Sequence, residues 1–147
     1  MLYADNRRAS FDYEILEKFQ VGIVLEGHEV KSIRLGRINV AGSYAKIIGN
    51  ELWLVGATIS PYQPQNTASN YDPQRTRKLL VKKSELRYLI GKLQEKGLTL
   101  VPLSVYNKNS LIKLELGLGK SKKKSDKREK IKTRETERKI ERTLKQY

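Results

Sequence analysis

The 147-residue chain lacks cysteine, has a single histidine and contains no long apolar run. Without cysteine it can form neither disulfides nor thiolate metal sites. A membrane-spanning helix needs about 20 consecutive apolar residues, and residues 1–10, which include Arg7 and Arg8, lack the apolar centre of a signal peptide. We therefore expect a cytoplasmic protein with one modest core that does not enter membranes.

Acidic residues are scarce at the C-terminal end. Residues 120–147 hold thirteen lysines and arginines against five acidic residues, a net charge of +8 out of +14 for the whole chain. Only four of these residues are apolar, too few for a separate core. We predict a domain over residues 1–119 and a basic tail over 120–147 that is disordered when free, helical when bound and attracted to a polyanion. The alternative is a solubilising terminus without a specific partner.

Alternation of apolar and polar residues predicts strands over residues 13–25, 44–48, 51–59, 98–106 and 111–118. Gly49-Asn50 is typical of a tight hairpin with glycine at its first central position. Pro102 indicates an edge or a bulge. In the strand over residues 51–59 we expect one side to carry Trp53, Val55, Ala57 and Ile59.

Two helices are expected between these strands. One covers Gly27 to Leu35 and ends at Gly36, and the other has Ser84 as N-cap, a core-facing stripe and Gly97 as terminator. The proline-containing segment from Ser60 to Thr76 shows no periodicity and is read as a long loop. About six antiparallel strands with few helices favour a closed or partly open barrel, because closure removes sheet edges.

No catalytic residue, metal site or cofactor is expected. His28 has Glu26 and Glu29 nearby but no nucleophile or metal partner, so a solvated side chain is favoured over an acid or base. Gly117-Leu118-Gly119 lacks the third glycine of a nucleotide-binding loop and is read as a flexible joint before the tail.

Basic residues cluster at two places in the domain. One group is Lys31, Arg34 and Arg37, and the other is Arg75, Arg77, Lys78, Lys82 and Lys83. If the groups lie side by side, they form a patch that follows a phosphate backbone; otherwise they belong to an ordinary charged surface. Tyr13 and Tyr44 can stack on unpaired bases or pack in the core, and the sequence favours neither.

Four motifs along the chain closely resemble those of the SsrA-binding protein family, SmpB, in unbroken register from about Asn6 to Leu144. They are Asn6-Arg7-Arg8-Ala9, Gly27-x-Glu29-Val30-Lys31-Ser32-Ile33-Arg34, Asp72-Pro73-x-Arg75-x-Arg77-Lys78-Leu79-Leu80, and Lys122-Lys123 followed by Asp126-Lys127-Arg128.

The resemblance implies a mainly β protein with a few α-helices, built as an oligonucleotide-binding-type antiparallel β-barrel with a basic C-terminal tail. It implies a monomer that binds the tRNA-like domain of transfer-messenger RNA and delivers it to stalled ribosomes. In this rescue process, trans-translation, the incomplete peptide is tagged for proteolysis. The family has no catalysis of its own, and its tail is expected to sense the empty message channel near the small-subunit decoding centre.

The resemblance and the residue patterns together nominate two sets of RNA-contacting residues. On the barrel they are Asn6, Tyr13, Gln20, Glu29, Lys31, Arg34, Tyr44, Arg75, Arg77, Lys78 and Leu80. In the tail they are Lys120, Lys122, Lys123, Lys127, Arg128, Arg134, Arg138 and Leu144.

The chain departs from the family pattern at four positions. Gln20 replaces a common glutamate, Ser121 a glycine, Ser125 a histidine or aromatic residue, and Thr136 a tryptophan. At Gln20 we expect either no charged interaction or an amide hydrogen bond in its place. Composition alone equally suits a ribosome-associated RNA chaperone or a structural ribosomal protein, and less well an RNA-modifying enzyme; the ordered motifs favour the rescue factor.

Overall fold

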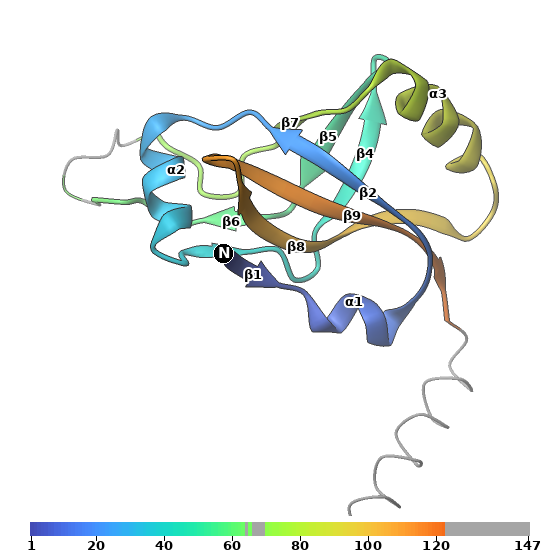
Figure 1. The fold of residues 1–147 in the computed structure, drawn as a ribbon, viewed down its shortest axis with the longest axis horizontal. Helices are drawn as coiled ribbons and strands as arrows, with labels where there is room; N and C mark the ends of the chain where they lie inside the picture. The colour runs from blue at the N-terminus through green and yellow to red at the C-terminus, as the bar shows by residue number, and fades with distance from the viewer. Residues whose placement is uncertain (64, 66–69, 123–147) are drawn as a thin grey trace, which may run out of the picture.

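The structure, a computed structural model, describes residues 1–63, 65 and 70–122 (Figure 1). Its elements follow one another as β1 Leu2–Asp5, α1 Arg7–Asp12, β2 Tyr13–Ile23, α2 Gly27–Arg34, β3 Ile38–Asn39, β4 Tyr44–Ile48, β5 Glu51–Val55, β6 Thr58–Ile59, β7 Arg77–Leu80, α3 Lys83–Lys92, β8 Leu98–Lys108 and β9 Leu111–Ser121. None of the helices in this part of the chain is long and apolar enough to cross a bilayer.

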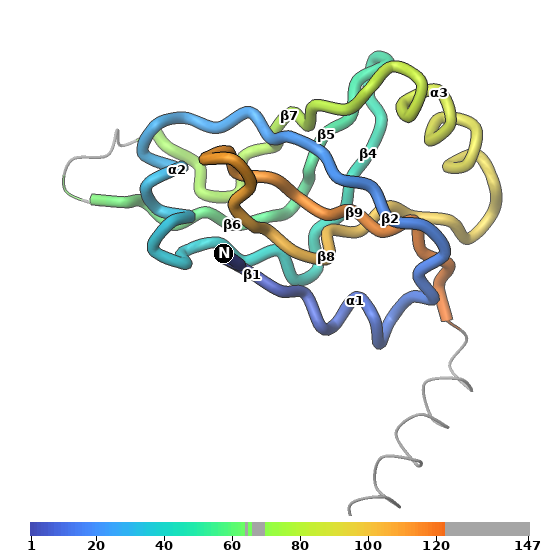
Figure 2. Tube along the Cα trace, viewed as in Figure 1, coloured from blue at the N-terminus to red at the C-terminus, as the bar shows by residue number. Residues whose placement is uncertain are grey.

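Six antiparallel strands close into a ring in the order β8-β4-β5-β7-β2-β9, because β9 pairs with β8 again (Figure 2). The short strand β1 adds to the C-terminal half of β8, and β3 pairs with β6 in a separate two-stranded sheet. The predicted mainly β barrel is therefore confirmed. In Figure 1, α2 lies at one end of the long axis of the molecule and α3 near the other.

The core fills the inside of this ring. Each strand turns alternate side chains inward, and the long β8–β9 pair supplies the largest share of them. Fully buried members include Leu52, Leu54, Leu79, Leu100, Leu114, Leu116 and Leu118. The ladder shifts register between Pro102 and Ser104, which confirms the predicted bulge, since proline cannot donate to a ladder.

The hairpin at Gly49-Asn50 is confirmed, and both residues adopt positive φ, 58° and 59°. The prediction that Trp53, Val55, Ala57 and Ile59 share one side of the following strand is wrong. Leu52 and Leu54 are buried, whereas Trp53 and Val55 are only half-buried. Gly56 follows β5 with a φ of 85° and changes which alternate positions face the core. Ala57 and Ile59 beyond it are therefore buried.

Both predicted helices are confirmed, but the second begins and ends at other residues than the sequence predicted. α2 stops at Arg34, and Gly36 then takes a φ of 77° as expected. α3 begins at Lys83, so Ser84 is not its N-cap, and it ends at Lys92, before Gly97. Sequence patterns missed β1, α1, β3 and β7, which are too short to show a periodicity, and merged β5 and β6 into one strand.

Candidate nucleic-acid interface

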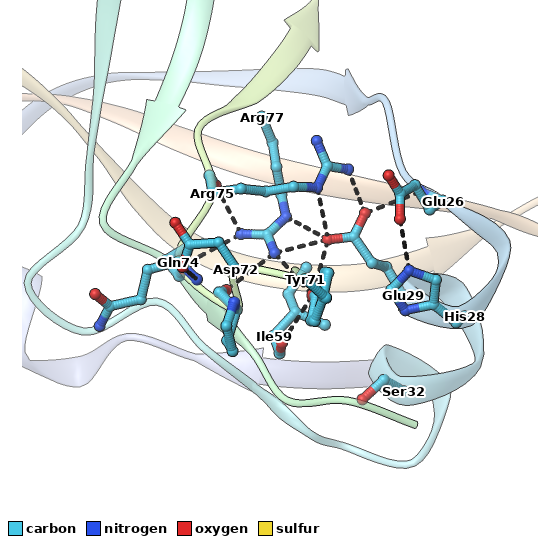
Figure 3. A network of polar contacts seen from close by, with 12 residues as sticks. Glu26, His28, Glu29, Ser32, Ile59, Tyr71, Asp72, Gln74, Arg75 and Arg77 are labelled. Atoms are coloured by element: carbon cyan, nitrogen blue, oxygen red, sulfur yellow. Dashed lines mark hydrogen bonds and ion pairs between the residues drawn. The ribbon is translucent and has the colours of Figure 1, made fainter. Parts of the chain in front are cut away.

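Glu29 and Arg77 form a buried ion pair at the end of the barrel covered by α2 (Figure 3). Glu29 lies in the first turn of α2, and Arg77 points inward because β7 alternates buried and exposed residues. Neither side chain has exposed surface, and Arg77 Nε donates to Glu29 Oε2 over 2.8 Å. Arg75 adds a second, partly exposed guanidinium, whose Nε lies 3.2 Å from Glu29 Oε2.

Every donor of Arg77 in this network has an acceptor. Its Nη1 donates to the carbonyls of Ala57 and Arg75, each at 3.0 Å, and its Nη2 to the Pro73 carbonyl at 3.0 Å and the Tyr71 hydroxyl at 3.2 Å. Two buried charges are tolerated only when they are paired and hydrogen-bonded in this way. The network therefore fixes the segment before β7 against α2.

The electrostatics of Glu29 reflect the same contacts. Burial alone would raise its pKa, but hydrogen bonds from Arg75, the Glu26 amide and Arg77, together with the charge of Arg77, lower the pKa from 4.5 to about 2. Burial, followed by the charge of Glu29, raises the pKa of Tyr71. Glu29 is thus held ionised by its surroundings.

His28 also belongs to this network and is therefore only partly solvated, with 32% of its side chain exposed. Its Nε2 lies 2.5 Å from Glu26 Oε2, and its ring meets Tyr71 edge-on with centroids 4.7 Å apart. Ser32 Oγ also donates to the Ser60 carbonyl over 2.5 Å, a further bond between α2 and the loop.

The nomination of Glu29 and Arg77 as direct RNA contacts is not compatible with their complete burial. Their physical role in this structure is to support the surface. Arg75 is also turned toward Glu29, and Lys78 pairs with Glu51 over 3.2 Å. Three members of the second basic group are thus engaged by carboxylates, whereas its Lys82 and Lys83 lie exposed.

What remains exposed at this end is the basic face of α2. Lys31, Arg34 and Arg37 all lie on the surface. Lys31 Nζ lies 5.7 Å from the ring centroid of Tyr62, and Arg37 Nη1 donates to the Tyr62 carbonyl over 3.1 Å. Arg34 Nη2 donates to the Ser110 carbonyl over 3.3 Å, which ties α2 to the β8–β9 turn. Neutral partners such as these leave the three charges available for phosphates.

A second group of nominated residues meets around a cavity of about 350 Å³, which we call the Asn6 cavity. Asn6, Tyr13 and Tyr44 are distant in sequence, and α1, β2, β4 and β8 bring them together. The full lining is Asn6, Arg8, Ala9, Asp12, Tyr13, Gly42, Ser43, Tyr44, Thr99 and Val101. Tyr44 is 41% exposed and Tyr13 half-buried, so both present part of a ring to an open cavity.

Asn6 anchors the start of this cavity. Its amide Nδ2 donates to the Pro102 carbonyl over 2.8 Å, while its buried Oδ1 has no partner among the described residues. A buried acceptor without a partner is uncommon in folded proteins and suits a ligand donor such as a base amino group.

Gln20 and Leu80 lie on the exposed surface. Lys108 Nζ donates to Gln20 Oε1 over 3.3 Å, so an amide hydrogen bond takes the place of a charged pair there. Leu80, 54% exposed at the end of β7, lies opposite Gly22 in the β2–β7 ladder. Its side chain is thus available for an apolar contact.

The tail residues within the described part are bound to the barrel. Lys120 belongs to β9 opposite Leu98, and Lys122 Nζ donates to the Ser10 carbonyl over 2.9 Å. β9 thus extends through Ser121, two residues beyond the expected end of the domain. The other nominated tail residues, Lys123, Lys127, Arg128, Arg134, Arg138 and Leu144, lie outside the described residues.

Gly117 and Gly119 do not form the predicted joint. Both lie within the continuous ladder of β9, paired with β8 and β2. A Cβ on Gly117 would lie 2.9 Å from Leu103 Cδ1, and one on Gly119 would lie 2.9 Å from Tyr13 Cβ. These glycines are needed because neighbouring side chains pack directly on the strand backbone.

The sequence model of the SmpB protein family matches residues 3–146. This chain belongs to the SmpB family. The SsrA-binding protein of Carboxydothermus hydrogenoformans is 53% identical over 143 residues, which cover 97% of this chain and 95% of that protein. That of Thermosynechococcus vestitus is 50% identical over 143 residues, covering 97% of this chain and 94% of the relative.

A solved structure extends the SmpB comparison to the fold. It is described as "tmRNA-SmpB: a journey to the center of the bacterial ribosome", and one of its chains is similar to this one with a TM-score of 0.67 and 49% identity. The match covers 82% of this chain and 85% of that chain. The motifs that predicted the family therefore correspond to a shared SmpB fold.

Sequence reasoning missed two residues of this SmpB surface. Tyr71, whose hydroxyl lies 2.9 Å from the Ile59 carbonyl, stands in a loop without periodicity, so only its place beside the Asp72-Pro73 motif could have drawn attention to it. Thr99 lines the Asn6 cavity from an ordinary strand position, and no local pattern marks it.

Proposed function

We propose that this SmpB-family chain binds the tRNA-like domain of transfer-messenger RNA and delivers it to stalled ribosomes for trans-translation. The observation that carries the proposal is the Asn6 cavity, which unites Asn6, the first residue of a family motif, with the tyrosine rings of Tyr13 and Tyr44. Relatives named SsrA-binding protein and the solved tmRNA-SmpB structure support the same RNA as ligand.

Recognition proceeds by stacking, backbone contact and charge, and no catalytic step is assigned to the protein. The exposed ring of Tyr44 offers a face for an unpaired base, and Asn6 Oδ1 offers an acceptor for a base or ribose donor. Lys31 and Arg34 of α2, with Arg37 just beyond the helix, contact phosphates. The Glu29–Arg77 network supports these contacts by holding α2 in place.

The basic tail is assigned a separate task, the sensing of an empty message channel in the small subunit. Message and tail would compete for the same space by steric exclusion. The high density of lysine and arginine in residues 123–147 suits an RNA-lined channel. In this proposal the barrel selects the RNA, and the tail detects whether message occupies the channel.

Affinity purification of the full chain, followed by sequencing of the bound RNA, tests the proposal. One dominant species, transfer-messenger RNA, is expected. Bulk ribosomal RNA without that species would overturn the assignment and favour a structural ribosomal protein or a general RNA chaperone. A matched purification of Tyr44→Ala identifies the part of the signal that depends on the Asn6 cavity.

A further inference from the structure

An apolar groove lies between β4 and α3 and adjoins the Asn6 cavity. Its volume is about 340 Å³, and its walls come from Ile47 on β4, Ile90 and Leu93 on α3, and Leu98 at the start of β8. We call it the α3 groove. Tyr44 and Thr99 line both the α3 groove and the Asn6 cavity, so the two adjoin along these residues.

The apolar character of the groove follows from the sequence of α3. The helix carries an apolar stripe that the barrel covers only in part, made of Leu86, Leu89, Ile90 and Leu93. Of these, Leu89 is completely buried against the core. Ile90 remains half-buried and lines the groove. The helix therefore supplies one apolar wall of the groove, which Ile47 and the ring of Tyr44 also line.

Lysine side chains lie beside the α3 groove. A third cavity of about 390 Å³ shares Leu98 with it and is lined by Lys92, Lys96 and Lys120 together with the carboxylates Glu17 and Glu95. Lys92 pairs with Glu95 over 3.4 Å. Neither Lys96 nor Lys120 forms an ion pair within residues 1–63, 65 and 70–122. The α3 groove thus adjoins both the ring of Tyr44 and two cations, Lys96 and Lys120, that have no carboxylate partner among the described residues.

We propose that the α3 groove is a second nucleotide-binding subsite for the RNA held in the Asn6 cavity. One base occupies the Asn6 cavity, the neighbouring base occupies the α3 groove, and Tyr44 lies between them. The phosphate backbone then runs toward Lys96 and Lys120. This inference rests on the proposed function, and it commits the groove to the tRNA-like domain of transfer-messenger RNA.

Three observations favour single-stranded RNA as the occupant. Base faces are apolar and stack on aromatic side chains, while phosphates need nearby cations, and the structure offers both next to the α3 groove. The shared wall at Tyr44 makes the groove continuous with the proposed RNA site. An apolar peptide would fill the groove but would leave Lys96 and Lys120 without a complementary charge.

Two variants with matched controls test the subsite by binding of the isolated tRNA-like domain RNA to the full-length protein. Ile90→Ser should weaken binding about fivefold or more, with Ile48→Ser, an exposed isoleucine outside both cavities, as control. Lys96→Glu should weaken binding and make the negative slope of log K against log[salt] shallower by about 0.7–0.9 per lost phosphate contact. Arg87→Glu makes the same charge change on the exposed side of α3.

The outcomes separate the subsite from the proposed function. If Ile90→Ser and Lys96→Glu bind like their controls while Tyr44→Ala binds weakly, the Asn6 cavity stands and the second subsite is refuted. If the unmodified protein itself does not bind this RNA, the proposed function fails. A photo-crosslinker at position 90 should join transfer-messenger RNA; crosslinks only to ribosomal RNA or to protein would overturn the inference. Circular dichroism melts establish that each variant is folded.

Discussion

Glu29 Oε2 and Arg77 Nη2 lie 2.6 Å apart, and neither side chain has any exposed surface. A residue of helix α2 is thereby joined to a residue of strand β7, 48 positions away in the chain. The pair helps to hold α2, with its exposed Lys31 and Arg34, against the barrel. The sequence motifs around Glu29 and Arg77 thus have a structural role, the attachment of α2 to β7.

Replacement of Glu29 by glutamine should destabilise the protein by about 3–5 kcal/mol. The variant leaves the Arg77 guanidinium buried without its counterion, which costs more than the pair contributes. Urea unfolding gives the free energy. Glu51→Gln removes the exposed pair with Lys78 and should cost at most about 1 kcal/mol; similar losses in the two variants would contradict the structural role of the buried pair.

Stability should fall in acid because of the same carboxylate. The folded protein holds the pKa of Glu29 at about 2, below the ordinary 4.5, so its contribution is fully present above about pH 4.5 and is lost as the pH falls toward 2. The shift corresponds to roughly 3 kcal/mol. Urea titrations at pH 5, 4 and 3 should show a smaller decline for Glu29→Gln than for the unmodified protein. Parallel declines would assign the acid sensitivity to other groups.

Removal of the Tyr44 ring should weaken RNA binding without unfolding the barrel. Stacking on an exposed aromatic ring contributes about 1–3 kcal/mol per base, and Tyr44 is 41% exposed. Fluorescence anisotropy with the tRNA-like domain should show this loss for Tyr44→Ala and near-normal binding for Tyr44→Phe, which keeps the ring. Equal losses in both variants would indicate a hydroxyl contact in place of stacking.

Alanine at Gly119 should be more damaging than alanine at Gly117. The new methyl group at Gly119 meets Tyr13 Cβ at 2.9 Å, an atom fixed to the backbone, whereas that at Gly117 meets the mobile end of Leu103. Overpacking of this kind costs typically 1–3 kcal/mol. Gly27→Ala, with nothing within 4 Å, is the control in thermal melts. Gly119→Ala should also weaken RNA binding, because Tyr13 lines the Asn6 cavity.

A stop codon after Lys122 should separate RNA binding from ribosome rescue. The shortened chain keeps all of β9 and the bond from Lys122 to the Ser10 carbonyl, so the barrel should bind the tRNA-like domain nearly normally. Peptide tagging on stalled ribosomes should be lost in a reconstituted translation assay. Proportional loss of binding and tagging would refute the division of labour between barrel and tail. A stop after Gly119 also removes the last rungs of β9 and should lower stability.

The sequence by itself determined the long strands, the two main helices and the family. These features depend on neighbours within one element, whose period of 2 or 3.6 residues is visible in the printed order. Lys31, Arg34 and Leu80 are exposed as their positions suggested.

Only the tertiary structure decided which charged side chains are exposed and which glycines lie packed within a strand. Arg77 and Lys31 look alike as cations in a motif, yet closure of the barrel buries the first beside Glu29 and leaves the second on the surface. Gly119 looked like a joint until Tyr13 was found packed on it. The Asn6 cavity likewise exists because β4 and β8 bring Tyr44 beside residues far away in the chain. Burial and long-range contact are properties of the whole fold, and no local pattern of residues encodes them.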